Sequence, residues 1–143
     1  MNRIDFQQLA ELRLKEAKAL FAAGFPEGAY YLAGYAVECA LKACIARRTQ
    51  QHDFPDKKLV DKSYTHDVEK LLDAAGLKDN LAKDIGGNKR LEMEWEFVKS
   101  WSEQSRYVLL EGEDSERKKS AFLMIFSVES EGGGVLRWIK QYW

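Results

Sequence analysis

The chain is poor in residues that interrupt helices, form disulfides or exchange protons near neutral pH. Its 143 residues include two prolines, two cysteines and two histidines. Pro26 and Pro55 both lie where a helical pattern stops. Cys39 and Cys44 are five residues apart on one expected helix, so they point in different directions and cannot readily form a disulfide. No further Cys or Cys/His pair completes a zinc set, and we interpret both cysteines as buried, reduced thiols.

A strong charge imbalance and a membrane span are also missing. The formal net charge is -1, so no cationic field covers the molecule, and any contact with RNA or DNA has to use a local patch. Residues 1–18 lack the continuous apolar core of a signal peptide. Residues 29–46 are slightly short for a membrane span, and each of their two charges would cost about 2.5–3.5 kcal/mol in a bilayer. We expect a cytoplasmic protein that makes no membrane contact.

Alternation of apolar and polar residues is absent from every segment of useful length, so no strand is predicted. Apolar residues instead recur with helical spacing, which predicts an all-α bundle in a single domain over residues 1–143. A helix is also expected between the N-cap residue Thr65 and Gly76, followed by a short turn at 78–85. The remaining expected helices cover residues 5–22, 27–48, 88–104, 115–130 and 135–143, and 49–64 is a polar connection.

Residues 29–46, AYYLAGYAVECALKACIA, predict a central helix that is apolar almost all round except at Glu38 and Lys42. An exposed pair of this spacing contributes only about 0.2–0.5 kcal/mol. A partly buried pair needs further partners, because desolvation of each charge costs several kcal/mol. We predict that Arg106 faces Glu38, since a guanidinium binds a carboxylate bidentately. Such a tie either holds two helices in register or orients Arg106 toward a phosphate.

Four segments, in this order along the chain, carry a family pattern: GAYYLAGYAVECALKACIA, YTHDVEKLLDAAGL, WSEQSRY and GGGVLRWIKQYW. They resemble the HEPN domain of higher eukaryotes and prokaryotes, in particular a bacterial stand-alone branch, over residues 28–143. The resemblance implies an antiparallel four-helix up-and-down bundle with short additional helices, often dimeric. It also implies one of two activities. Many HEPN domains are metal-independent RNases, and others bind nucleotides or partners, frequently a small nucleotidyltransferase encoded next door.

The family's RNase signature is an Arg followed, after four to six residues, by a His. The Arg would hold the scissile phosphate, and the His would act on the 2′-hydroxyl or the leaving group. No His follows Arg106. Arg47 and His52 fit the bare spacing, but they lie at the end of a helix and in a loop, so we interpret the match as coincidence. We interpret His66 as a capping or packing residue.

Two hypotheses remain. The first is a non-catalytic HEPN-type module, a homodimer without metal or cofactor, that binds a nucleotide, RNA or a partner nucleotidyltransferase, in a toxin–antitoxin or defence setting. Its predicted site consists of Glu38, Lys42, Ser102, Arg106 and Tyr107. The alternative is a metal-independent endoribonuclease toxin in which Arg106 grips the phosphate as a catalytic residue beside a non-standard proton-transfer group. The missing downstream His favours the first hypothesis.

Two smaller features complete the expectations. Trp95 and Trp101 are six residues apart and cannot share one narrow helix face, so we expect one of them at a subunit contact. The glycine run 132–134 precedes a helix, where backbone N–H groups can bind phosphate, but no P-loop Lys-Ser/Thr follows. A flexible turn is the favoured interpretation of this run.

Overall fold

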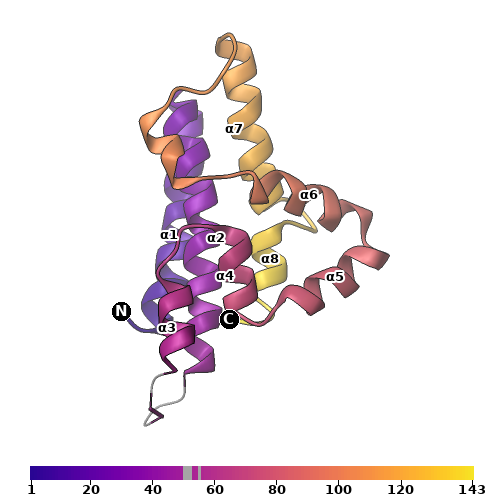
Figure 1. Cartoon of the computed structure of the whole chain (residues 1–143). Coiled ribbons are helices and arrows are strands. Elements are labelled where there is room, and N and C mark those ends of the chain that lie inside the picture. The colour runs from indigo at the N-terminus through magenta and orange to yellow at the C-terminus, as the bar shows by residue number, and fades with distance from the viewer. Residues whose placement is uncertain (50–52, 55) are drawn as a thin grey trace.

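The computed structural model describes residues 1–49, 53–54 and 56–143, and within these ranges the chain is helical, with no strand (Figure 1). The all-α prediction is confirmed. None of the helices in these ranges has an apolar stretch long enough to cross a membrane. The elements are α1 (Arg3–Ala22), α2 (Pro26–Arg48), α3 (Lys57–Ser63), α4 (Val68–Ala74), α5 (Lys78–Gly87), α6 (Lys89–Lys99), the 3-10 helix η1 (Glu103–Tyr107), α7 (Asp114–Val128) and α8 (Val135–Ile139).

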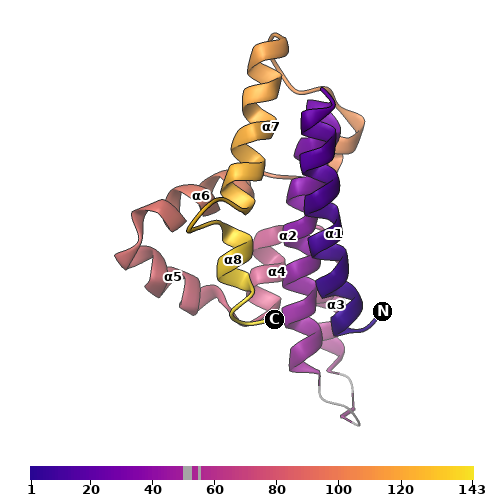
Figure 2. The ribbon, with the colours of Figure 1, turned by 180° about the vertical axis from the view of Figure 1, so that it is seen from behind.

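The two long helices α1 and α2 form an antiparallel pair (Figures 1 and 2). A capping box starts α1: Asp5 donates its backbone N–H to Asn2 Oδ1 at 3.0 Å, and Asn2 donates its own to Asp5 Oδ2 at 2.8 Å. Pro26 occupies the first turn of α2, where its missing N–H leaves no helical bond unmade. Fully buried alanines, which include Ala10, Ala17, Ala33, Ala36 and Ala40, let the two backbones approach closely.

Helix α2 is the centre of the molecule. It packs against α1, α4, η1, α7 and α8, which explains why its sequence is apolar almost all round. Gly34 on α2 makes room for the indole of Trp101, because a Cβ at this position would lie 2.2 Å from Trp101 Cδ1. Trp95 and Trp101 are both buried in the core of the single chain. Neither indole is largely exposed in the single chain, and the expectation that one of them lies at a subunit contact stays a prediction.

Helices α5 and α6 form an arm that projects from the side of the bundle (Figures 1 and 2). Its base is held by Trp138 on α8, which donates its indole N–H to Asp84 Oδ2 at 2.8 Å. The sequence predicts only a short turn at 78–85, but the helix continues to Gly87, where the following Asn88 caps α6 through its side chain. The helix expected over 88–104 ends earlier, at Lys99, because the chain turns there to place Trp101 against Gly34.

The polar connection 49–64 also contains a helix that the sequence pattern does not predict. Asp56 caps the N-terminus of α3 by accepting a hydrogen bond from Lys58 N at 2.9 Å. Lys57 and Asp61 then form an i,i+4 pair at 2.6 Å. These local polar contacts stabilise about two turns of helix without a buried residue, so apolar periodicity gives no sign of it.

The glycine run before α8 has a packing role. Gly134 has φ 109°, and a Cβ there would lie 2.4 Å from the carbonyl oxygen of Val128. A Cβ on Gly133 would lie 2.7 Å from Arg90 Cζ. The buried carboxylate of Glu94 accepts the Gly134 N–H at 2.9 Å and also binds Arg90 Nε at 2.7 Å. This turn therefore locks α6 against the C-terminal helix.

Candidate functional site

The carboxylate of Glu38 lies inside the molecule with two nitrogen partners, and neither of them is Arg106. Glu38 is 1% exposed. Its Oε1 accepts a hydrogen bond from Lys42 Nζ at 2.9 Å and lies 2.9 Å from His66 Nδ1. In the described part of the chain no ion pair joins Glu38 to Arg106, so the predicted Glu38–Arg106 tie is wrong. The early end of α6 explains this, because Arg106 then belongs to η1 rather than to a helix that faces Glu38.

His66 reaches this carboxylate from the segment that leads into α4. Asp67 is the N-cap of α4 and accepts hydrogen bonds from Glu69 N at 2.9 Å and Lys70 N at 3.1 Å. Thr65 Oγ1 accepts the Asp67 N–H at 3.1 Å. These bonds fix the backbone on both sides of His66, whose ring neither caps the helix nor packs into the core.

The contact with Glu38 also sets the tautomer of His66. A carboxylate accepts hydrogen bonds, so Nδ1 of the ring carries the hydrogen in this pair and Nε2 is left as the second functional nitrogen. The His66 side chain is 50% exposed and that of Lys42 is 20% exposed. Two nitrogen donors at the surface therefore compensate one deeply buried acid, which is the reason that an otherwise apolar helix keeps Glu38 and Lys42.

The two cysteines of α2 are chemically quiet. Burial, together with the nearby carboxylate of Glu38, raises the pKa of the Cys39 thiol to about 11. Burial also raises the pKa of Cys44 to about 12. Both are free and buried. The thiolate is the reactive form, so neither cysteine is a nucleophile near neutral pH.

One face of α2 carries Tyr31, Tyr35, Glu38 and Lys42, because steps of four, three and four residues follow the helical repeat. The rings of Tyr31 and Tyr35 are stacked, with centroids 5.9 Å apart and an interplanar angle of 7°. Tyr31 also stacks on Trp101, at 6.0 Å between centroids. This face therefore joins the Glu38 cluster to a row of partly buried aromatic rings.

At the other end of this face η1 presents Arg106. Ser102 caps η1 by accepting a hydrogen bond from Gln104 N at 3.2 Å. Arg106 and Tyr107 line a hollow of about 390 Å³ together with Tyr31 of α2. The Arg106 guanidinium carbon lies 4.9 Å from the centroid of the Tyr107 ring. Arg106 is exposed and forms no ion pair with any carboxylate in the described ranges.

The predicted site residues thus fall into two groups on one face of α2. Glu38 and Lys42 belong to the buried cluster, and Ser102, Arg106 and Tyr107 belong to η1. Sequence reasoning missed Tyr31, Tyr35 and His66 as members of this face. The four-three-four spacing from Tyr31 to Lys42 is a signal that could have found the two tyrosines, whereas the approach of His66 depends on how α4 packs against α2.

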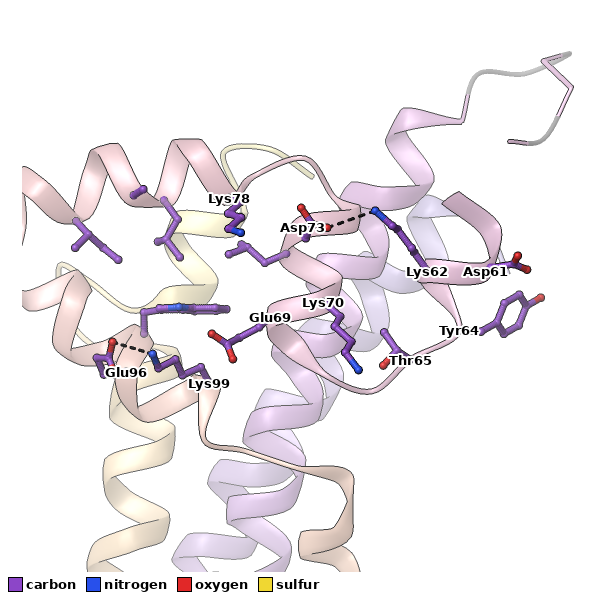
Figure 3. A pocket seen from close by; sticks show the side chains of 15 residues that line it. Asp61, Lys62, Tyr64, Thr65, Glu69, Lys70, Asp73, Lys78, Glu96 and Lys99 are labelled. Atoms are coloured by element: carbon purple, nitrogen blue, oxygen red, sulfur yellow. Dashed lines mark hydrogen bonds and ion pairs between the residues drawn. The ribbon is translucent and has the colours of Figure 1, made fainter. Parts of the chain in front are cut away.

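The largest hollow lies between the pair α3–α4 and the arm α5–α6 and has a volume of about 880 Å³ (Figure 3). Its apolar lining comes from both walls and includes Leu72, Leu81, Ala82, Ile85 and Trp95. Its charged lining consists of four lysines and four acids: Lys62, Lys70, Lys78, Lys99, Asp61, Glu69, Asp73 and Glu96. The balance of charge gives this groove no preference for an anion.

Arg47 and His52 supply the sequence match to the RNase spacing. His52 lies outside the described residues. Arg47 donates a hydrogen bond from its guanidinium to the carbonyl oxygen of Tyr142 at 3.1 Å, which ties the end of α2 to the C-terminal segment. Within the ranges that the structure describes, no three His, Cys, Asp or Glu side chains come together as a metal site requires.

Comparison with known proteins identifies the family of this chain. The family model described as the HEPN domain matches residues 5–123, which is most of the chain. The chain belongs to the HEPN family. No curated protein and no solved structure gave a match. Family membership confirms the resemblance carried by the α2, α4 and η1 segments, and it places this chain in a group of helical modules associated with nucleotide binding and RNase-like chemistry.

Proposed function

We propose that this chain is a non-catalytic HEPN module, one domain over residues 1–143 with an antiparallel four-helix up-and-down core and short additional helices, that binds the phosphates of a nucleotide or of RNA. One observation carries the proposal: the exposed guanidinium of Arg106 stands beside aromatic rings in a hollow and has no acid partner in the described chain. By contrast, the charges of Glu38 and Lys42 are matched to each other and to His66.

The chemistry of this hollow suits a phosphate next to a base. A guanidinium presents several N–H donors in a planar fork that fits phosphate oxygens bidentately. The ring of Tyr107, which is 71% exposed, offers a flat surface on which a base can stack, largely without regard to sequence. Lys42 of α2 and the nearby His66 lie farther along the same face, where their side chains, 20% and 50% exposed, can donate hydrogen bonds to a longer ligand.

The test is a binding titration with Arg106→Ala. Fluorescence anisotropy with a labelled single-stranded RNA, and competition with ATP, are measured at low salt for the wild type, Arg106→Ala and the matched control Arg137→Ala. Arg137 is an exposed arginine on α8, away from η1. We expect Arg106→Ala to weaken binding about tenfold or more and Arg137→Ala to leave it nearly unchanged. Equal affinities for all three proteins would refute the proposal.

Homodimer formation is a second part of the proposal, and α7 offers the surface for it. Phe122 is 49% exposed and Phe126 is 43% exposed. Their rings stack at 5.8 Å, and Phe21 of α1 approaches Phe122 at 6.2 Å. Half-exposed aromatic rings in a row are typical of subunit contacts. At low protein concentration, light scattering should give twice the chain mass for the wild type and a single chain mass for Phe122→Ser/Phe126→Ser.

The partner of such a module is proposed to be a small nucleotidyltransferase, in a toxin–antitoxin or defence pair. This part rests on membership of the HEPN family and on the exposed apolar surface described above. Co-purification with the product of a neighbouring nucleotidyltransferase gene tests it directly. The complex should survive moderate salt if the contact is apolar, since only charged contacts are strongly screened.

A metal-independent endoribonuclease is the second candidate function, and the contact between Glu38 and His66 favours it. A buried carboxylate that holds Nδ1 of a half-exposed histidine leaves Nε2 as a proton acceptor, as in hydrolytic triads. His66 would be the proton-transfer group that the sequence lacks after Arg106. In this reaction Nε2 takes the proton of a 2′-hydroxyl, the 2′-oxygen bonds to phosphorus, and the 5′-oxygen leaves and takes a proton from solvent.

An RNA cleavage assay in EDTA separates the two candidates. Cleavage that yields 2′,3′-cyclic phosphate ends and is lost in both His66→Gln and Arg106→Ala would establish the endoribonuclease. Binding without cleavage by the wild type supports the non-catalytic module. Cleavage that persists in His66→Gln would exclude the Glu38–His66 pair as the source of proton transfer.

A further inference from the structure

The segment after Arg106 exposes an unusual run of apolar side chains. Tyr107, Val108 and Leu109 are 71%, 60% and 75% exposed. Val108 has φ -127° and ψ 148°, so the backbone is extended at this point. The base Arg106 precedes the run and the exposed acid Glu111 follows it. This segment, residues 106–111, is therefore an apolar strip with a positive charge at one end and a negative charge at the other.

The groove between α3–α4 and α5–α6 also combines an apolar lining with charged side chains, which is complementary to segment 106–111. In the described chain, no hydrogen bond or ion pair joins its two walls, so the groove is open to an occupant. Lys62 pairs with Asp73 at 3.5 Å, and Lys99 pairs with Glu96 at 3.0 Å, each pair within one wall. The contact with Glu96 raises the pKa of Lys99, and Glu69 adds a weaker attraction from the opposite wall.

Two charges in this groove are left for an occupant. Glu69 of α4 and Lys78 of α5 point into the hollow (Figure 3). Neither has an ion-pair partner within contact distance among the residues that the structure describes. Between them lies the apolar lining that Leu81, Ile85 and Trp95 contribute. The groove therefore presents an apolar floor with one unpaired acid and one unpaired base.

We propose that this groove binds residues 106–111 of a second copy of this chain. Tyr107 and Leu109, which lie on the same side of the extended backbone at Val108, cover the apolar floor, Arg106 pairs with Glu69, and Glu111 pairs with Lys78. A free polyanion fits less well, because the four acids of the groove balance its four lysines. Extended segments and amphipathic helices commonly bind in such grooves through alternate apolar anchors.

This contact is heterologous, because groove and segment are different surfaces of one chain. Each bound pair still offers one free groove and one free segment, so assemblies grow with concentration unless a ring closes. The contact goes beyond the proposed function and bears on it, because Arg106 cannot bind Glu69 of a neighbour and a phosphate at once. Ligand binding at η1 and assembly through the groove therefore compete.

Two exposed substitutions test the contact separately. Leu109→Ser alters the segment and leaves the groove intact, whereas Ala82→Glu obstructs the groove and leaves the segment intact. Both positions are exposed, so the fold is expected to tolerate the changes. Sedimentation velocity should show the mass of the wild type rising with concentration. Each variant alone should associate about tenfold or more weakly.

Mixing the two variants gives the decisive result. Both variants are mixed in the Phe122→Ser/Phe126→Ser background, which removes the proposed α7 contact. The intact segment of Ala82→Glu fits the intact groove of Leu109→Ser, so an equimolar mixture should restore a single contact and form a complex that cannot extend further. Leu12→Ser, at another exposed leucine on α1, is the matched control and should assemble like the wild type. A concentration-independent wild-type mass would overturn the proposal. So would a mixture that associates no better than its components, the result expected if a different protein occupies the groove.

Discussion

The Glu38 cluster and the η1 segment lie on the same face of α2 but differ in how their charges are paired. Glu38 is buried and its Oε1 has two nitrogen partners, Lys42 and His66, each at 2.9 Å. Arg106 is exposed, without a carboxylate partner in the described chain, beside exposed apolar residues. The buried Oε2 of Glu38 has no hydrogen-bond partner in the described chain, so the whole carboxylate depends on the two nitrogens at Oε1. A buried charge paired in this way contributes to the fold, whereas a charge left free at the surface is available to a ligand.

Removal of both nitrogen partners of Glu38 should have the largest effect on stability. Lys42→Ala/His66→Ala leaves a buried carboxylate without a partner, and we expect the free energy of unfolding to fall by about 3 kcal/mol or more. Urea denaturation followed by circular dichroism measures this. The matched change Lys118→Ala/Arg106→Ala also removes two cations but from exposed positions, and should lower the free energy of unfolding by about 0.5 kcal/mol at most.

Gly34→Ala tests the packing of Trp101 against α2, the contact that ends α6 before it reaches Arg106. A Cβ at position 34 meets the rigid indole of Trp101 at 2.2 Å, so the indole or the helix must shift. We expect a loss of about 1–3 kcal/mol in thermal or urea unfolding. Gly86→Ala in α5 is the control, since a Cβ there has nothing within 4 Å, and it should stabilise the protein by up to about 1 kcal/mol. Equal effects at both glycines would contradict the close approach of Trp101 to α2.

The two buried cysteines of α2 predict a loss of stability at high pH. Burial raises the pKa of Cys39 to about 11 and of Cys44 to about 12 in the folded chain, above the ordinary value of about 8.5 in an unfolded one. The unfolded chain therefore loses these protons first, and the free energy of unfolding falls as pH rises above about 8.5, by on the order of 1 kcal/mol per pH unit for each thiol.

Urea denaturation between pH 8 and pH 10 measures this slope. Cys39→Ala/Cys44→Ala should flatten the decline, because the two groups that deprotonate in the unfolded state are gone. A decline of equal steepness in the double variant would mean that other groups, and not these thiols, govern stability in this range. Thiol labelling of the folded wild type at pH 7 should also be slow.

The smallest expected effect is that of Arg106→Ala on stability. The side chain is exposed and its recorded contact is with the adjacent ring of Tyr107, so the free energy of unfolding should change by no more than about 0.5 kcal/mol. The substitution should lower the affinity for the ligand and leave the free energy of unfolding nearly unchanged. A loss as large as that of the Lys42/His66 double variant would remove the distinction between the two regions.

Much of this arrangement follows from the sequence. Helical periodicity identifies α1, α2, α4, α7 and α8, although the N-cap of α4 is Asp67 and not the predicted Thr65. The apolar surround of Glu38 and Lys42 indicates a polar cluster within the core. The sequence does not predict the partner of Glu38, because that partner depends on where α6 ends. That end is set by the fit of Trp101 against Gly34, a contact between residues distant in sequence. The same limit applies to the groove, which exists only because the α5–α6 arm projects from the bundle.

The salt dependence of RNA binding tests the central claim most directly, that Arg106 is the free phosphate-binding charge of this face. The observed binding constant is measured against salt concentration for the wild type, Arg106→Ala and Arg137→Ala, all with folding confirmed by circular dichroism. Loss of one phosphate contact should reduce the slope of log K against log salt by about one for Arg106→Ala and leave it unchanged for Arg137→Ala. Identical slopes for the wild type and Arg106→Ala would contradict the account.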